Sequence, residues 1–432
     1  MYVFWPTGFA SNLYDAMNYD IATLMAHLDA SPTARHVVSR ASSILESAGF
    51  VRTDTSGVPS SAALARGFVT SGGTLIAWTG LDATGTDSLR IVGAHTDSPG
   101  LTLKPGRSSR GHGFGLLNVE VYGGPLLNSW LDRDLALAGS VLDVNGTTHL
   151  FGTNRAVARI AQLAIHLDRD VNDKGLTLDR QHHLRPLWTI DDSADFVDLL
   201  ASESGLARSS IAAWECRLVD VQPSALIGSD STMLASGRLD NQLSCWAAVH
   251  ALVDSNGPNV VVLFDHEEIG SQSATGADSS FFPHVLERLL VAAGLSRDEY
   301  LRTLVRAHAV SSDNAHAVHP NYPERHDLDN APLFNRGIAV KWNTNQRYAT
   351  TIDALDPLLR AARASNMELQ HFSSKNTMPC GSTIGPITAS VLGIPTVDIG
   401  IPQLSMHSAR EVCGADDAIR LQKLLSAYFA RA

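Results

Sequence analysis

The chain of 432 residues is 44% hydrophobic and 18% charged. This composition supports a folded core, excludes an intrinsically disordered chain, and allows two domains or one domain with a large insertion. The formal net charge of -11 argues against a broad surface for nucleic acids or anionic membranes.

Residues 1–6 are apolar, but the first Lys or Arg is Arg35. A secretory signal peptide needs a positive segment ahead of its apolar stretch, so we expect none here. Apolar runs such as residues 260–264 are far too short to span a bilayer. The scattered cysteines lack zinc-finger or thioredoxin spacing, which indicates unpaired thiols in a reducing compartment. We therefore expect a cytoplasmic protein without a nucleic-acid or membrane partner.

The first elements along the chain are predicted helices over residues 14–28 and 34–48, because apolar residues recur there at three- and four-residue spacing. Gly49 ends the second helix. Short apolar runs then predict buried strands, with helix-like stretches between several of them. The predicted strands are 74–79, 89–94, 260–265, 307–311, 337–341 and 396–399, and the later helices are 241–253, 352–364 and 416–429. This alternation is typical of an α/β sheet covered on both faces.

The middle of the chain has a different pattern. Turn-forming Gly, Asn and Pro residues are frequent there, short alternating strands such as 116–122 occur, and residues 168–185 are strongly polar. We therefore predict a β-rich domain, residues 101–228, inserted into a catalytic domain formed by residues 1–100 and 229–432.

A His-x-Asp pair follows the predicted strand 89–94. Residues i and i+2 of a strand share a face, so His95 and Asp97 can point the same way. A metal-binding imidazole needs a partner on its other nitrogen, and Asp97 is placed to be that partner. Taken alone, such a pair is more often a structural hydrogen bond.

Four ionisable residues, 265–268, end the apolar strand 260–265. At the end of a buried strand these groups repel one another unless cations or donors meet them, although a solvated loop is the alternative. Adjacent glutamates diverge, so one of Glu267 and Glu268 can bind a metal while the other faces the attacking water. The residues alone do not decide which.

Three further candidate ligands lie at comparable places. Asp313 follows strand 307–311, His407 follows strand 396–399 through a short loop, and Asp240 precedes helix 241–253. Asp240 could equally be an ordinary helix N-cap.

Together these side chains follow four buried strands at their C-terminal ends, where open α/β sheets place ligand sites. Imidazoles and carboxylates without thiolates suit zinc, manganese or cobalt, and argue against a closed structural zinc site. Two imidazoles and three carboxylates exceed one tetrahedral site, but they fit two metals that share a bridging carboxylate.

In order along nearly the whole chain, these segments resemble the aspartyl aminopeptidase family of two-zinc peptidases. The resemblance rests on LDASPT at 28–33, GAHTDSP at 93–99, RLDN at 238–241, EEIGS at 267–271, D-x-AHAVHPNY at 313–322, PCGSTIGP at 379–386 and MHS at 406–408. It implies a zinc-aminopeptidase-like mixed sheet flanked by helices, with an inserted β-rich domain that acts in dimerisation or as a lid.

The resemblance also implies the roles of the site residues. Two Zn²⁺ ions per subunit, or Co²⁺ or Mn²⁺ in their place, are expected. Glu267 is then the general base and Asp97 the supporting carboxylate. The implied ligands are His95 and Asp313 for one metal, Glu268 and His407 for the other, and Asp240 as the bridge.

Members of the family remove an N-terminal Asp or Glu from peptides, so Lys341 is expected to bind the substrate carboxylate. Tyr348 and His316 match other substrate-contacting positions, and His166 matches a histidine that reaches a neighbouring subunit's active site. The residues alone suggest a solvated lysine, a tyrosine at the core edge and a surface histidine. The family further implies a tetrahedral homododecamer built from dimers, with inward-facing sites.

Two positions depart from the family pattern: His266 stands where Asn is common, and Asn314 where Met is common. Both flank expected ligands. One rival function is a related two-metal aminopeptidase or deacylase with neutral specificity, and the two are separated by whether Lys341→Ala harms acidic substrates far more than Leu substrates. Another is a non-catalytic binding protein on a peptidase fold, which typically lacks a metal ligand or the base.

Overall fold

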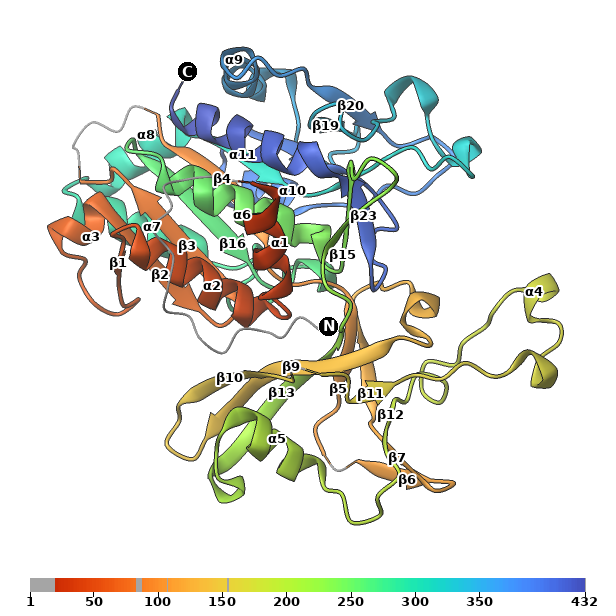
Figure 1. Cartoon of the computed structure of the whole chain (residues 1–432). Helices are drawn as coiled ribbons and strands as arrows, with labels where there is room; N and C mark the ends of the chain where they lie inside the picture. The colour runs from red at the N-terminus through yellow and green to blue at the C-terminus, as the bar shows by residue number, and fades with distance from the viewer. Residues whose placement is uncertain (1–19, 83–87, 107, 154, 432) are drawn as a thin grey trace.

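Short apolar runs of the sequence form the central layer of the molecule, a nine-stranded mixed sheet (Figure 1). The computed structural model describes residues 20–82, 88–106, 108–153 and 155–431. The strands are β1 (Val51–Arg52), β2 (Arg66–Ser71), β3 (Thr74–Thr79), β4 (Arg90–His95), β16 (Asn259–Phe264), β17 (His308–Ser312), β19 (Ala339–Trp342), β20 (Gln370–Ser373) and β21 (Thr396–Gly400). Their order is β1-β2-β3-β16-β4-β17-β21-β19-β20. At the centre, β16, β4, β17 and β21 are parallel neighbours, whereas β3 is antiparallel to β16 and β19 to β21.

Helices cover both faces of this sheet, because successive residues of a buried strand point to opposite sides. In β16, Val261 and Leu263 pack into one core cluster, while Val260, Val262 and Phe264 pack into another. One face is covered by α1 (Ile21–Asp29), α2 (Ala34–Ser47), α6 (Leu239–Val253), α9 (Asp356–Ala364) and α11 (Ala415–Phe429), and the other by α3 (Ser61–Ala65), α7 (Phe281–Ala292), α8 (Arg297–Arg306) and α10 (Ile384–Leu392). The α/β class predicted from the sequence is confirmed.

A second sheet, antiparallel throughout, is formed by the middle of the chain (Figure 1). Its strands are β5 (Gly100–Leu103), β6 (Ser109–Gly111), β7 (Phe114–Leu116), β8 (Val119–Tyr122), β9 (Asp134–Asp143), β10 (Thr148–Gly152), β11 (Ala158–Arg159), β12 (Leu187–Thr189) and β13 (Ile211–Asp220). The long strands β9 and β13 pair along their length, and α5 (Phe196–Ser204) packs Phe196 and Leu200 into the core of this lobe. The middle segment is therefore β-rich, while its boundaries at 101 and 228 stay a prediction.

Between β11 and β12 the chain leaves the second sheet as an arm, residues 160–186. The arm carries two short helices, η2 (Ile165–Leu167) and α4 (Val171–Lys174). In Figure 1 the α4 end points away from both sheets. Apolar side chains on the arm are accessible, with Leu163 63% and Leu167 73% exposed. Residues of the same chain that the structure describes leave much of this apolar surface uncovered.

A small five-stranded sheet was not predicted from the sequence. Its strands are β14 (Ala225–Ile227), β15 (Met233–Ser236), β18 (Ala315–His316), β22 (Pro402–Leu404) and β23 (Glu411–Gly414), in the order β14-β15-β23-β22-β18. Figure 1 shows β15 and β23 beside the junction of the two larger lobes. This sheet brings the start of α6 and the loop between β22 and β23 to one place.

The observed elements differ from the predicted ones in three places. The predicted helix 352–364 is broken into η7 (Ile352–Ala354) and α9, because Pro357 lacks an N–H and is tolerated only in the first turn of a new helix, which begins at Asp356. The predicted strand 116–122 is two strands, because β7 pairs with β12 whereas β8 pairs with β5. The first helix begins at Ile21 after an Asp20 N-cap, and residues 14–19 of its predicted span lie outside the described residues.

Within the described ranges, no helix has the length and apolar character that a membrane crossing requires. The expectation about a signal peptide concerns residues 1–6, which lie outside these ranges, so it stays a prediction, as does the cytoplasmic location. Cys216, Cys245 and Cys413 are buried free thiols, and Cys380 is partly exposed.

Candidate metal centre

The C-terminal ends of parallel strands bring the first candidate ligands together. His95 is the last residue of β4, and Asp313 directly follows β17. Glu267 and Glu268 lie in the short helix η4 (Glu267–Ile269), which follows β16. Because β16, β4 and β17 are parallel neighbours, their ends meet at one edge of the sheet.

The start of α6 holds Asp240 against this edge. Ser98 Oγ donates to the Asp240 carbonyl at 2.8 Å, and Asn241 Nδ2 donates to the Ser312 carbonyl at 2.8 Å. No backbone N–H of α6 donates to the Asp240 carboxylate in the described structure, so the N-cap alternative is wrong. The carboxylate turns into the cluster instead.

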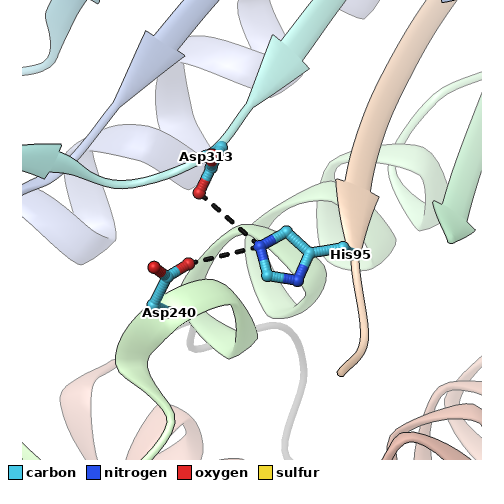
Figure 2. A group of neighbouring side chains, drawn as sticks. All are labelled: His95, Asp240 and Asp313. Carbon is cyan, nitrogen blue, oxygen red and sulfur yellow. Dashed lines mark ion pairs between the residues drawn. The ribbon is translucent and has the colours of Figure 1, made fainter. Parts of the chain in front are cut away.

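Asp240 lies between two histidines, and Figure 2 shows it and Asp313 both facing His95. His95 Nε2 is 3.3 Å from Asp240 Oδ1 and 3.6 Å from Asp313 Oδ1. His407 Nε2 is 3.6 Å from Asp240 Oδ2 and 3.4 Å from Glu268 Oε2. All five predicted ligand residues therefore converge, with Asp240 at the centre.

A buried glutamate that the sequence did not single out fixes two of these residues. Glu411, at the start of β23, is 1% exposed. Its Oε2 accepts the backbone N–H of Asp240 at 3.0 Å, and its Oε1 accepts that of His407 at 2.6 Å. His407 also lies in the left-handed region with φ 68°, and its Nδ1 is 3.1 Å from the Gly124 carbonyl. The only sequence signal for Glu411 was its place four residues after His407.

Asp97 connects His95 with the two glutamates. His95 Nδ1 is 3.0 Å from the Asp97 carbonyl and 3.4 Å from its Oδ1. The same carboxylate accepts the backbone N–H groups of Glu267 and Glu268, both at 3.1 Å, and the hydroxyl of Tyr122 at 2.7 Å. Asp97 therefore contacts His95 as expected, and it also caps η4, which was not foreseen.

The residues at which the chain departs from the family pattern have structural roles nearby. His266 precedes η4 with φ 68°, a left-handed conformation in which His and Asn are enriched. Asn314 Nδ2 donates to Gln403 Oε1 at 2.9 Å. Neither side chain takes part in the ion pairs of the cluster.

The cluster is electrostatically crowded. Burial raises the pKa of Glu267 to about 8, with the charges of Asp313, Asp97 and Asp240 adding to the effect against that of His95. Burial also raises the pKa of Glu268 well above its usual value, and the charge of Asp240 raises it further. Burial alone would lower the pKa of His407, but Asp240 and Glu268 raise it to about 10. Buried acids arranged in this way are stabilised by added positive charge.

Divalent metal ions fit this donor set. Candidate ligand atoms lie within 4.8 Å of one another in three groups, His95–Asp240–Asp313, Asp240–Glu268–His407 and His95–Glu267–Glu268. Asp240 Oδ1 and Glu268 Oε1 are buried, and no hydrogen bond of normal geometry reaches them from the described residues. Oxygen and imidazole ligands without thiolate suit an open zinc site.

A cleft of about 400 Å³ opens onto the cluster. Its wall includes three of the predicted substrate-contacting residues, Lys341, Tyr348 and His316. Lys341 is 2% exposed, its Nζ is 3.5 Å from Asp313 Oδ2, and it stands 5.2 Å from the centroid of the Tyr348 ring. His166 is not part of this cleft, because it lies exposed on the arm in η2.

Comparisons with known proteins agree with this geometry. The sequence profile of the Aminopeptidase I zinc metalloprotease (M18) family matches residues 27–429. A "Probable M18 family aminopeptidase 2" of Streptomyces coelicolor is 45% identical over 419 residues, 94% of this chain and 96% of the relative. The structure of Chaetomium thermophilum mApe1 matches with a TM-score of 0.83 at 30% identity, over 95% of this chain and 96% of that one. A mApe1 dodecamer of S. cerevisiae matches with a TM-score of 0.82 at 26% identity, over 95% and 96%. The family resemblance read from the sequence is confirmed, and the chain belongs to the M18 family of zinc metallo-aminopeptidases.

Proposed function

We propose that this enzyme uses two metal ions to release N-terminal Asp or Glu residues from peptides. The observation that carries the acidic specificity is Lys341, a buried ammonium in the wall of the cleft. A buried charge is costly unless a partner of opposite charge meets it. Asp313 at 3.5 Å and the buried carboxylate of Asp398 meet part of that charge, and the carboxylate of an acidic substrate side chain supplies a further partner.

The metal ligands of the proposal follow from the ion pairs. His95 and Asp313 would hold one metal, Glu268 and His407 would hold the other, and Asp240 would be shared by both. When bound, two Zn²⁺ ions, or Co²⁺ or Mn²⁺, would supply Lewis-acid activation of the attacking water and of the scissile carbonyl. Asp97 and Glu411 keep these ligands in place through hydrogen bonds to their backbone and imidazole groups.

The remaining steps belong to side chains of the cleft. Glu267 takes the proton of the attacking water and returns it to the departing amine, a role supported by its place in the cleft wall beside His95 and Glu268. Tyr348 and His316 contact the substrate from the cleft wall. Lys341 binds the acidic side chain and so positions the first peptide bond beside Glu267.

The proposal extends to assembly as a tetrahedral homododecamer built from dimers. Its support is the dodecamer among the similar structures, together with the arm, whose apolar side chains are exposed in the single chain. Packing of the arm on a neighbouring subunit would cover this surface and carry His166 to that subunit's cleft. Light scattering on the purified protein tests the assembly, and a monomer or an isolated dimer would contradict it.

A panel of aminoacyl reporter substrates tests the specificity. The wild-type enzyme should cleave Asp and Glu reporters, lose this activity with a chelator, and regain it with zinc, cobalt or manganese. In Lys341→Met, kcat/KM for the acidic reporters should fall by about 100-fold or more, because loss of a buried charge pair costs about 3 kcal/mol or more. Leu reporters should change by less than about tenfold.

The matched control is Lys423→Met, which removes an exposed lysine on α11 and should leave all reporters unchanged. An equal loss on acidic and neutral reporters in Lys341→Met would show that Lys341 does not set specificity. Preference of the wild-type enzyme for Leu reporters would instead support the related aminopeptidase with neutral specificity.

A further inference from the structure

A turn of the second sheet reaches into the metal centre of the main sheet. Tyr122 ends β8, and its hydroxyl donates to Asp97 Oδ2 at 2.7 Å. The next residue, Gly123, lies so close to η4 that an added Cβ would stand 3.2 Å from both Glu268 Cβ and the Glu268 carbonyl oxygen. The carbonyl of Gly124 accepts from His407 Nδ1 at 3.1 Å when that nitrogen carries the proton. Residues 122–124 therefore contact both ends of the cluster.

The Tyr122 hydroxyl acts on a carboxylate that has four neighbours. Asp97 is 1% exposed, and its two oxygens face the N–H groups of Glu267 and Glu268, the imidazole of His95 and Tyr122. Bulk water has little access to this carboxylate, so a lost donor is not simply replaced. A change in the tilt of the carboxylate is transmitted to His95 and to the peptide groups of η4.

Tyr122 is itself held by the second sheet. The Arg217 guanidinium, on β13, lies over its ring with Cζ 4.5 Å from the ring centroid. Arg217 Nη2 also donates to the Ser98 carbonyl at 2.5 Å, next to Asp97. This stack fixes the ring between two strands of the second sheet and the loop after β4. The position of the hydroxyl thus depends on how the two lobes are docked.

We propose that Tyr122 is a positioning residue through which the second sheet sets the geometry and metal affinity of the centre. Tyr122 lies outside the group of ligand residues, and its effect passes through Asp97 to His95 and η4. This inference rests on the proposed two-metal function, and it assigns a part of that function to the middle segment of the chain.

The test is Tyr122→Phe, studied by titrating Co²⁺ into the metal-free enzyme and recording its visible absorption. Groups that orient metal ligands typically contribute about 10–100-fold to metal affinity. We expect Co²⁺ to bind about tenfold more weakly and its absorption spectrum to change. With metal at saturation, kcat should fall while KM stays within about twofold, because the substrate-binding wall is untouched.

The matched control is Tyr428→Phe, which removes a buried tyrosine hydroxyl that donates to the His308 carbonyl at 2.8 Å, away from the cleft. It should lower thermal stability but leave Co²⁺ affinity and spectrum unchanged. In an Asp97→Asn background, Tyr122→Phe should weaken Co²⁺ binding by less than about twofold further, because both changes act on one path.

Wild-type affinity, spectrum and kcat in Tyr122→Phe would overturn the proposal. If the losses of Co²⁺ affinity in Tyr122→Phe and Asp97→Asn simply add in the double variant, the proposal would also be overturned, since the hydroxyl would then act by a route that does not pass through Asp97. A wild-type enzyme that binds no Co²⁺ is a separate result, and it would overturn the two-metal function together with the role of Tyr122.

Discussion

Replacement of Asp97 by Asn tests how much the buried carboxylate contributes to the metal centre. An amide retains one acceptor oxygen and places an NH₂ group where the other oxygen was. If the NH₂ takes the Oδ2 position, the N–H of Glu268 loses its acceptor, and if it takes the Oδ1 position, that of Glu267 does. A lost hydrogen bond to a charged group costs about 1.5–3 kcal/mol, and an unsatisfied buried donor about 1–3 kcal/mol.

Taken near the lower ends of these ranges, the two contributions together amount to roughly 3 kcal/mol, which corresponds to a factor of about 100. With Glu268 and His95 as the proposed ligands, metal binding would require η4 and the imidazole to be correctly placed, so we expect metal affinity to fall by about this factor. Competition of zinc with a chromophoric chelator measures the change. Asp417→Asn is the control, since Asp417 is a fully buried carboxylate that accepts N–H groups of Asn335 and Gly337 far from the cleft. Equal zinc affinities in Asp97→Asn and the wild-type enzyme would refute the reasoning.

Three further outcomes follow from the site and the core. Glu267→Gln should lower kcat by about 1000-fold while elemental analysis still finds two metals per chain, and retained activity would contradict the general-base role. Metal removal should lower the melting temperature by roughly 5 °C or more, reversibly on addition of zinc, and an unchanged melting temperature would show that the acids of the cluster do not need a cation. His27 is buried in the core, where burial first and the charges of His250 and Arg40 next lower its pKa to about 3. Below about pH 6.5 the unfolded chain therefore binds more protons than the folded chain. The contribution of His27 to the free energy of unfolding is fully present above that pH and is lost as the pH falls towards 3. At pH 5 the loss is about 2 kcal/mol. Denaturant unfolding measures the free energy of unfolding at pH 7.5 and at pH 5. The difference between the two pH values should be about 2 kcal/mol smaller in His27→Leu than in the wild-type enzyme. An unchanged difference would contradict the lowered pKa of His27.

The edge of the sheet that carries the cluster was predictable because its strands are continuous apolar runs. β4, β16, β17 and β21 were all expected within one residue or so at each end, and their parallel pairing brings His95 and Asp313 together. Asp240 could not be assigned from the residues alone, because an acid at a helix start is compatible with an N-cap. The small sheet places His407 on its other side, and this contact favours the proposed ligand role over the N-cap.

The contacts from Tyr122 and Glu411 could not be predicted. Each joins elements that periodicity describes separately, and neither residue type at its position carries a metal-site pattern. Tyr122 lies in a segment that reads as an ordinary alternating strand, and its partner Asp97 lies in the loop that joins β4 of the main sheet to β5 of the second sheet. The docking of two sheets depends on side-chain shapes along their whole contact, which hydrophobic spacing does not record.

The place of β16 in the main sheet has a consequence for how the chain folds during synthesis. β3 and β4 follow each other in the sequence, yet β16 lies between them and pairs with both. Until residue 264 has left the ribosome, these two strands have open edges towards the missing one, and open edges are sites of mispairing. The second sheet has all its strands by Asp220, so it can fold first, as a unit. The lobe that later contributes Tyr122 is therefore complete before the metal centre can close around Asp97.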